Sequence, residues 1–152
     1  MPESNEELHR RVAAVCYRRT PAGPEFLLVR TWDGAWTFPK GMIDPGHTET
    51  EAAELEAWEE AGVKGIIEPQ PFTTYLAGKA AGNSNSERMK IEVTAYLLEV
   101  RETQPPPEKF RKPKWFDPVA AQKALADGRS ASRAREFDRV ISLAVQKILA
   151  IL

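Results

Sequence analysis

The chain has 152 residues, of which 42% are hydrophobic and 28% are charged. This length is typical of one domain, and this composition is typical of a globular protein rather than of a disordered, collagen-like or coiled-coil chain. Lysine and arginine number 21 against 22 aspartate and glutamate residues, so the formal net charge of -1 favours neither nucleic acid nor a membrane as a partner. We expect a single domain over residues 1–152.

The cellular compartment is predicted from the cysteine content and the start of the chain. Cys16 is the single cysteine, so no internal disulfide can form, which indicates a reducing compartment. The first residues are acidic and polar, whereas a secretory signal has a basic start and then an apolar run. No stretch reaches the roughly 18 consecutive apolar residues of a membrane-spanning helix. These features predict a cytoplasmic protein.

Strand patterns dominate the first part of the chain. Apolar runs at 11–17 and 25–30 flank a segment with two prolines and a glycine, which predicts two paired strands and their turn. Residues 36–38 predict a third strand. A helical pattern then extends to Gly62, and Thr48 followed by Glu51 forms a capping-box pattern at its start.

The second part of the chain begins with strands and ends with helices. Further strands are expected at 66–67, 72–76, 90–100 and 113–116, with a loop rich in glycine, asparagine and serine at 78–86.

Two helices are expected at the end. Asp117 and Pro118 predict the N-cap and first residue of a short helix that runs to about Ala126. The final helix is expected from about Ser132 to Leu149, with core-facing spacing of Phe137, Val140, Ile141, Ala144 and Ile148. Strands interrupted by one central helix predict an α/β fold with a mixed sheet between helices.

The segment from Gly41 to Val63 carries seven of the 22 acidic residues and no lysine or arginine. On a helix, Glu56, Glu59 and Glu60 fall within one arc because they are spaced i, i+3 and i+4. Their mutual repulsion is relieved if a divalent cation lies among them, and oxygen ligands without cysteine favour Mg²⁺ or Mn²⁺. The alternative is a solvated acidic helix face, which is the usual role of a charge run.

The same segment resembles the Nudix box. That pattern is glycine, five residues, glutamate, seven residues, then arginine, glutamate, an aliphatic residue, any residue, two glutamates, any residue, glycine and an aliphatic residue. The matching positions are Gly41, Glu56, Glu59, Glu60, Gly62 and Val63. His47 and Leu55 replace the first glutamate and the arginine, which are expected to pair with each other in the family, so both partners are lost together.

The resemblance implies a Nudix-type α/β/α sandwich and a Mg²⁺-dependent hydrolase of diphosphate linkages, with Mn²⁺ as the alternative metal. The implied metal ligands are the carboxylates of Glu56, Glu60 and Glu59 and the carbonyl of Gly41. Glu56 and Glu60 with the metal would serve catalysis by neutralising charge and orienting water. Glu59 or another nearby carboxylate would accept the proton of the attacking water.

Segments outside the box are most similar to the diphosphoinositol polyphosphate phosphohydrolase branch, namely 10–14, 87–90 and 112–116. Residues 38–41 are also similar to diadenosine polyphosphate hydrolases. The implied partner is therefore a phosphorylated small molecule, either an inositol pyrophosphate or a dinucleoside polyphosphate. Candidate substrate-binding residues are Arg10, Arg11, Lys40, Arg88, Lys90, Arg111 and Lys112, each with a solvated surface charge as the alternative. Trp32 is the tryptophan considered for stacking on a base.

Two other functions are weighed against hydrolysis. The differences at His47 and Leu55 suggest a degenerate Nudix module that binds a phosphorylated ligand or a protein without turnover. A role at RNA ends is disfavoured because the sequence has no stripe of alternating aromatic and basic residues, so we expect no nucleic-acid partner.

Overall fold

The computed structural model describes residues 7–79 and 89–151. Its strands are β1 (Glu7–Thr20), β2 (Gly23–Arg30), β3 (Trp36–Thr37), β4 (Lys40–Gly41), β5 (Val63–Ile67), β6 (Thr73–Lys79), β7 (Met89–Thr103) and β8 (Lys114–Phe116). Its helices are α1 (Glu49–Glu56), the π-helical turn η1 (Ala57–Ala61), the 3-10 turn η2 (Lys109–Arg111), α2 (Pro118–Ala126) and α3 (Ala131–Ala150).

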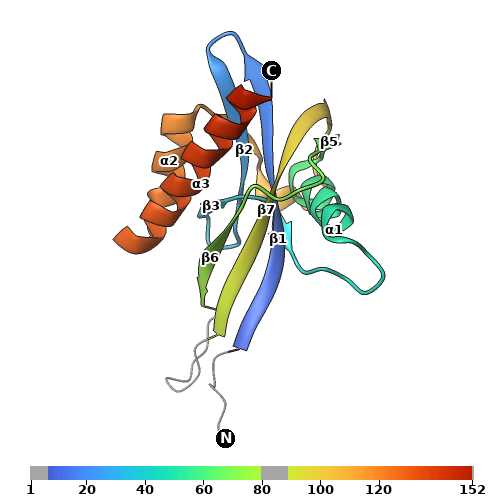
Figure 1. Ribbon diagram of the computed structural model, residues 1–152, viewed down its shortest axis with the longest axis vertical. Helices are drawn as coiled ribbons and strands as arrows, with labels where there is room; N and C mark the ends of the chain where they lie inside the picture. Colours follow the sequence, from blue (N-terminus) through green and yellow to red (C-terminus); the bar gives the residue numbers. More distant parts are fainter. Residues whose placement is uncertain (1–6, 80–88, 152) are drawn as a thin grey trace, which may run out of the picture.

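The strands form one mixed sheet with the order β3-β2-β1-β7-β5. Strands β1 and β7 are parallel, and the other described pairs are antiparallel. Helix α1 covers one face of the sheet, and α2 and α3 cover the other (Figure 1). The predicted α/β/α sandwich with a mixed sheet between helices is confirmed.

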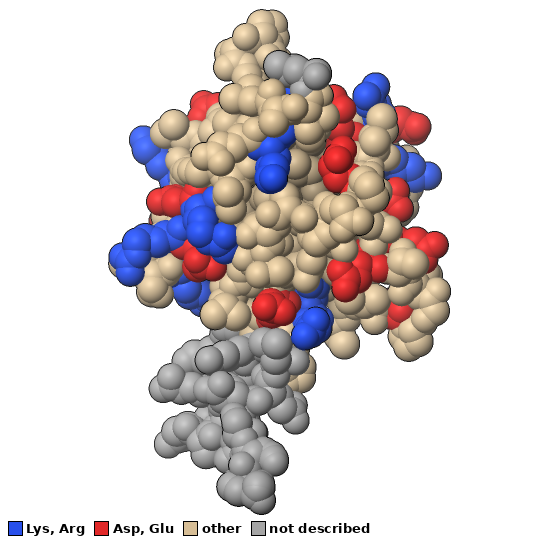
Figure 2. All heavy atoms as spheres, viewed as in Figure 1, with Lys and Arg blue, Asp and Glu red and all other residues tan. Residues whose placement is uncertain are grey.

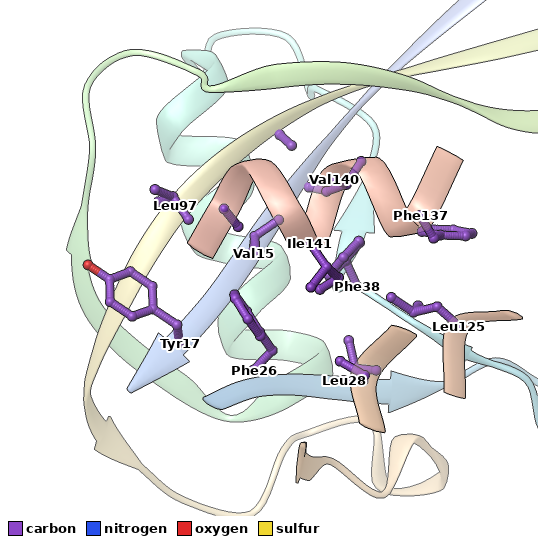
Figure 3. Packing of buried hydrophobic residues seen from close by; sticks show 14 of the residues in the cluster. Val15, Tyr17, Phe26, Leu28, Phe38, Leu97, Leu125, Phe137, Val140 and Ile141 are labelled. Atoms are coloured by element: carbon purple, nitrogen blue, oxygen red, sulfur yellow. The ribbon is translucent and has the colours of Figure 1, made fainter. Parts of the chain in front are cut away.

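Strand β1 is buried on both faces because side chains of a strand alternate between the two sides of its sheet. Ala13, Val15 and Tyr17 belong to the core under α2 and α3, and the residues between them belong to the core under α1. Figure 3 shows the first core, in which Phe38 packs against Phe137 of α3 with ring centroids 5.8 Å apart. The five apolar residues predicted to face the core from the final helix are all buried.

Helix α1 starts where the capping box predicts and approaches the sheet through small side chains. Thr48 accepts a hydrogen bond from the backbone of Glu51 at 3.1 Å, and the Glu51 carboxylate accepts one from the backbone of Thr48 at 2.8 Å. The buried residues of α1 and η1 against the sheet are Ala52, Ala53, Ala57 and Ala61, together with Glu60. Alanines bring the helix backbone close to the sheet, so the acidic side chains near its end reach the edge of the core.

Strand β4 is an element that the sequence patterns do not predict. Pro39 accepts a hydrogen bond from the backbone of Ala14 at 3.0 Å, and Gly41 then lies opposite Val12 of β1. The chain therefore pairs again directly after Pro39, which holds Lys40 and Gly41 beside α1. The predicted loop at 78–86 lies largely outside the described residues.

Among the described helices, none combines the length and the apolar composition needed to span a membrane.

Gly62 ends the helical segment with φ +70°, and a side chain there would overlap the backbone carbonyl of Gln104. We expect Gly62→Ala to lower the free energy of unfolding by about 2–5 kcal/mol, because a left-handed backbone and a backbone overlap both carry a cost. Gly128→Ala is the matched control, since Gly128 has φ +76° and open space around it, so only about 1–2 kcal/mol should be lost. Chemical denaturation measures both; equal losses would contradict the overlap.

Candidate functional site

Two carboxylates at the end of the α1 helical segment define the site. Glu56 is the last residue of α1 and is half-buried, while Glu60 in the π-helical turn η1 is only 5% exposed. The two carboxyl groups interact electrostatically, and each changes the acidity of the other. Single π-helical turns within helices are frequent at functional sites. The four-residue spacing therefore brings two acids into direct contact at the sheet, as predicted.

Gly41 closes the site from the side of strand β4. A Cβ at this position would overlap the Glu56 carboxyl group, so the backbone of Gly41 and the Glu56 carboxylate lie in direct contact. Only glycine leaves room for this approach. The structure thus places Gly41 against Glu56, although the two motif positions are fifteen residues apart in the chain.

Glu60 is held by two donors from different parts of the chain. The backbone N–H of Lys40 donates to its Oε1 at 3.3 Å, and Nη2 of Arg111 donates to its Oε2 at 3.1 Å. Arg111 is itself fixed, since Nη1 donates to the carbonyl of Arg30 at 3.1 Å and Nε donates to Glu108 at 2.9 Å. Arg111 is therefore positioned by three elements and orients Glu60.

Burial and mutual repulsion change the acidity of the pair. Burial, followed by the negative charge of Glu60, raises the pKa of Glu56 to about 8. Burial also raises the pKa of Glu60, and the Arg111 guanidinium opposes that rise. Without a cation, the pair therefore retains a proton on Glu56 near neutral pH.

The site fits a hard divalent cation. Its donors are carboxylate oxygens with the Gly41 backbone beside them, and a cation would replace the proton that the crowded pair otherwise retains. Within the described part of the chain, no three acidic, histidine or cysteine side chains form a metal-binding group. The carboxylate of Glu59 lies within electrostatic range of Glu56. The backbone carbonyl of Glu59 accepts a hydrogen bond from the backbone N–H of Glu108 at 3.1 Å. The expected set thus consists of a contacting pair and a more distant third carboxylate.

The predicted basic residues are only partly brought to the carboxylates. Lys40 and Arg111 reach them, and Lys112 is exposed on a left-handed backbone. The side chains of Arg10 and Arg11 leave opposite faces of β1, because neighbouring residues of a strand alternate. The remaining two predictions, Arg88 and the side chain of Lys90, lie outside the described residues.

The two departures from the motif lie on a separate pocket. His47 and Leu55 line a pocket of about 580 Å³ between α1 and β5, together with Trp58. None of Gly41, Glu56, Glu60 and Arg111 lines this pocket. The substitutions therefore change a surface next to the helix that carries the carboxylates without entering the carboxylate site.

Three residues near the site were missed by sequence reasoning. Glu108 fixes Arg111, and Arg129 and Arg133 line a second pocket together with Lys40. A signal existed for Arg133, because it lies in the first turn of α3, where the helix dipole disfavours a cation. No pattern in the sequence links Glu108 to Arg111 and Glu60.

Comparison with curated proteins gives partial matches. The mouse bis(5'-nucleosyl)-tetraphosphatase [asymmetrical] is 35% identical over 80 residues, which are 51% of this chain and 52% of that protein. The rat protein of the same name is 48% identical over 42 residues, or 26% of this chain and 29% of that protein. The chain thus spans about half, or less, of the length of the curated relatives it matches.

Comparison with solved structures gives matches over most of the chain. A Caenorhabditis elegans Ap4A hydrolase binary complex has a TM-score of 0.61 at 23% identity, covering 88% of this chain and 98% of that chain. A NUDIX hydrolase from Nitrosomonas europaea has a TM-score of 0.64 at 19% identity, covering 90% of each chain. The NUDIX domain of Shewanella oneidensis NrtR, complexed with ADP ribose, has a TM-score of 0.62 at 16% identity. This match covers 93% of this chain and 88% of that chain. At these identities the likeness shows a common fold.

The family assignment depends on a match along most of the chain. The model of the NUDIX domain matches residues 8–137, which include β1, the carboxylate helix and the start of α3. With the motif glycine placed against its carboxylate, and with the fold shared by solved Nudix proteins, this chain belongs to the Nudix family.

Proposed function

We propose that the protein is a Mg²⁺-dependent hydrolase that cleaves a phosphoanhydride linkage in a highly phosphorylated small molecule. The observation that carries this proposal is the contact of the half-buried Glu56 carboxyl group with the backbone of Gly41, beside the buried Glu60. In the reaction, a water oxygen bonds to one phosphorus, the bond from that phosphorus to the bridging oxygen breaks, and the water proton passes to a carboxylate.

The residues of the chain have distinct roles in this proposal. Glu56, Glu60 and the Gly41 carbonyl would hold the cation, which when bound neutralises phosphate charge and lowers the pKa of water. Arg111 keeps Glu60 oriented through its 3.1 Å ion pair. Glu59, on the same turn and half-buried, is the candidate proton acceptor. Mn²⁺ binds the same kind of oxygen ligands, so hydrolysis should be measured with Mg²⁺ and with Mn²⁺.

A nucleoside substrate is favoured by an exposed aromatic surface. Trp32 stacks on Phe110 with ring centroids 3.9 Å apart and an interplanar angle of 12°, yet it remains 83% exposed. Phe110 directly precedes Arg111, which binds Glu60. One face of a fixed indole ring is thus available near the carboxylates, and nucleobases stack on such faces. The names of the mouse, rat and Caenorhabditis relatives support a dinucleoside polyphosphate, and an inositol pyrophosphate remains the second candidate.

The degenerate-module alternative receives less support. It was motivated by His47 and Leu55, and these residues line a pocket that the catalytic carboxylates do not share. The lost ion pair is replaced by an exposed histidine and a half-buried leucine, so neither charge is left buried without its partner.

Glu60→Gln keeps the shape of the side chain and removes its charge. We expect Mg²⁺-dependent hydrolysis of Ap4A to fall by at least about 100-fold, because charge stabilisation at the metal site is worth several kcal/mol. Glu54→Gln is the matched control, since Glu54 is exposed on the same helix and should leave the rate unchanged. Release of phosphorylated product measures the rate, and thermal unfolding checks the fold. A folded Glu60→Gln protein with the parent's rate would contradict the proposed role.

The raised pKa of Glu56 predicts a pH dependence of stability in the metal-free protein. The pKa of Glu56 is 4.5 in the unfolded chain and about 8 in the folded protein, so below pH 4.5 the carboxyl group is protonated in both states. As pH rises from 4.5 toward 8, the unfolded chain loses this proton more readily than the folded protein, and the free energy of unfolding falls. Relative to Glu56→Gln, the parent protein should therefore lose stability progressively between pH 5 and pH 8. Thermal unfolding of both proteins in a metal chelator measures the difference, and a constant difference across this range would show that Glu56 is not perturbed.

Trp32→Ala tests the substrate class. If a base stacks on Trp32, KM for Ap4A should rise by about 5-fold to 100-fold, since one base stack contributes roughly 1–3 kcal/mol. KM for a diphosphoinositol polyphosphate should change little, because inositol has no planar ring. Steady-state kinetics on both substrates decides between a dinucleoside polyphosphate and an inositol pyrophosphate. Trp32→Phe is the control, because it retains an aromatic face. Equal changes on both substrates would argue against base stacking.

A further inference from the structure

A second pocket lies beside the carboxylates on the side of α3. Its volume is about 460 Å³, and it is formed by the turn between β2 and β3, by Lys40 of β4 and by the start of α3. Lys40 connects it to the catalytic site, because its backbone N–H binds Glu60 while its side chain lines the pocket. The pocket is thus next to the atoms that would hold the metal.

Three cations line this pocket. The ammonium group of Lys40 donates to Thr37 Oγ1 at 3.0 Å, Arg129 donates to the Leu125 carbonyl at 2.7 Å, and Arg133 donates to a carbonyl of β6. Among the residues that the structure describes, none of the three forms a salt bridge. Their hydrogen-bond partners are neutral oxygens, while Glu60 acts on Lys40 and Asp33 acts on Arg129 only through electrostatic attraction, so the positive charge is balanced in part.

Two acidic residues at the pocket do not cancel this charge. Asp33 and Asp127 are both exposed, and the Asp33 carboxylate accepts a hydrogen bond from the hydroxyl of Thr31. The cations are more deeply placed than these acids, because Lys40, Arg129 and Arg133 are all half-buried. Crowded, half-buried cations carry an electrostatic cost that a bound anion removes.

Buried donors without partners accompany these cations. Within the described residues, neither the Nε of Arg133 nor the hydroxyl of Tyr75 has a hydrogen-bond partner, although both atoms are buried. Tyr75 is 2% exposed and lies within electrostatic range of Arg129. Buried polar groups are rarely left without partners.

The face in Figure 2 has acidic and basic side chains interspersed, with no broad patch of one sign. Attraction of an anion therefore depends on local clusters of charge such as this pocket. A guanidinium group binds phosphate oxygens through two parallel hydrogen bonds, which makes a pair of arginines selective for phosphate.

We infer that the pocket of Lys40, Arg129 and Arg133 is a phosphate subsite that binds the part of a polyphosphate chain not cleaved at the carboxylates. Its ligand identity rests on the proposed function, whereas its affinity for a polyphosphate anion does not. A substrate that occupies both the carboxylates and this pocket needs phosphates beyond the cleaved linkage, so the subsite would favour longer phosphate chains.

Binding of inorganic tripolyphosphate to the full chain without divalent metal tests the subsite. We expect Arg129→Gln/Arg133→Gln to weaken this binding by at least about tenfold, because each lost charged hydrogen bond contributes a substantial part of the affinity. Arg135→Gln, exposed on the same helix, should bind as the parent does. Isothermal titration calorimetry at fixed ionic strength measures the three affinities. Equal affinities in all three proteins would overturn the subsite.

Two further measurements separate this inference from the proposed function. Arg133→Lys keeps the charge but loses the paired guanidinium hydrogen bonds, so its affinity should lie between those of the parent and of Arg133→Gln. This variant keeps the test valid if the double variant unfolds. An affinity equal to that of Arg133→Gln would overturn a role for charge, and an affinity equal to that of the parent would overturn a role for the guanidinium group. Turnover of Ap4A by the parent with Mg²⁺ is measured in parallel. If the protein shows no turnover but its tripolyphosphate binding depends on Arg129 and Arg133, the subsite is supported and the hydrolase proposal is refuted. If the protein turns over Ap4A but its tripolyphosphate binding is independent of both arginines, the hydrolase proposal is supported and the subsite is refuted.

Discussion

The direct contact between the Glu56 carboxyl group and the Gly41 backbone is the constraint on which the rest of the site depends. It exists because position 41 has no side chain and because β4 is hydrogen-bonded to β1 at that point. The Glu56 carboxyl group thus lies half-buried between the Gly41 backbone and Glu60, where burial and the charge of Glu60 raise its pKa to about 8. Such an arrangement is unfavourable for folding by itself and becomes favourable when a cation is bound. Stability and function are therefore opposed at this position in the metal-free protein.

The alanine face of α1 makes this contact possible. Ala52, Ala53 and Ala57 are buried against the sheet, and larger side chains there would hold the helix farther from β4. The π-helical turn then places Glu60 toward the core, and Gly62 ends the helix with a left-handed backbone. Small residues and one special backbone position thus set the location of the acids.

Charge is distributed around the site in two layers. The acids lie at the end of the α1 segment, and cations from distant parts of the chain lie around them: Lys40, Arg111, Arg129 and Arg133. Arg111 balances Glu60 directly, while the two arginines of the α3 region have no acidic partner among the described residues. The first pairing orients Glu60, the proposed metal ligand, and the second group lines the proposed anion site.

Local sequence patterns were sufficient to predict most of the elements and the position of the acids on one helical segment. Capping at Thr48, the end of the helix at Gly62 and the apolar spacing of α3 depend on interactions within a few residues, and these predictions are confirmed. The spacing of Glu56 and Glu60 likewise follows from one helix. The diphosphoinositol branch, the metal and the substrate-binding residues stay predictions, since they concern ligands and distant contacts.

Only the tertiary structure decided which distant residues meet these acids. The pairing of β4 with β1, the contacts of Arg111 with Arg30 and Glu60, and the pocket at the start of α3 join segments far apart in the chain. No periodicity encodes such contacts, because an isolated arginine has the same local pattern whether it is solvated or buried beside a site. The sequence by itself therefore determined the family, the layers and the acidic helix, whereas the cations around it were determined by how the sheet and α3 pack, which brings charges together across long stretches of chain.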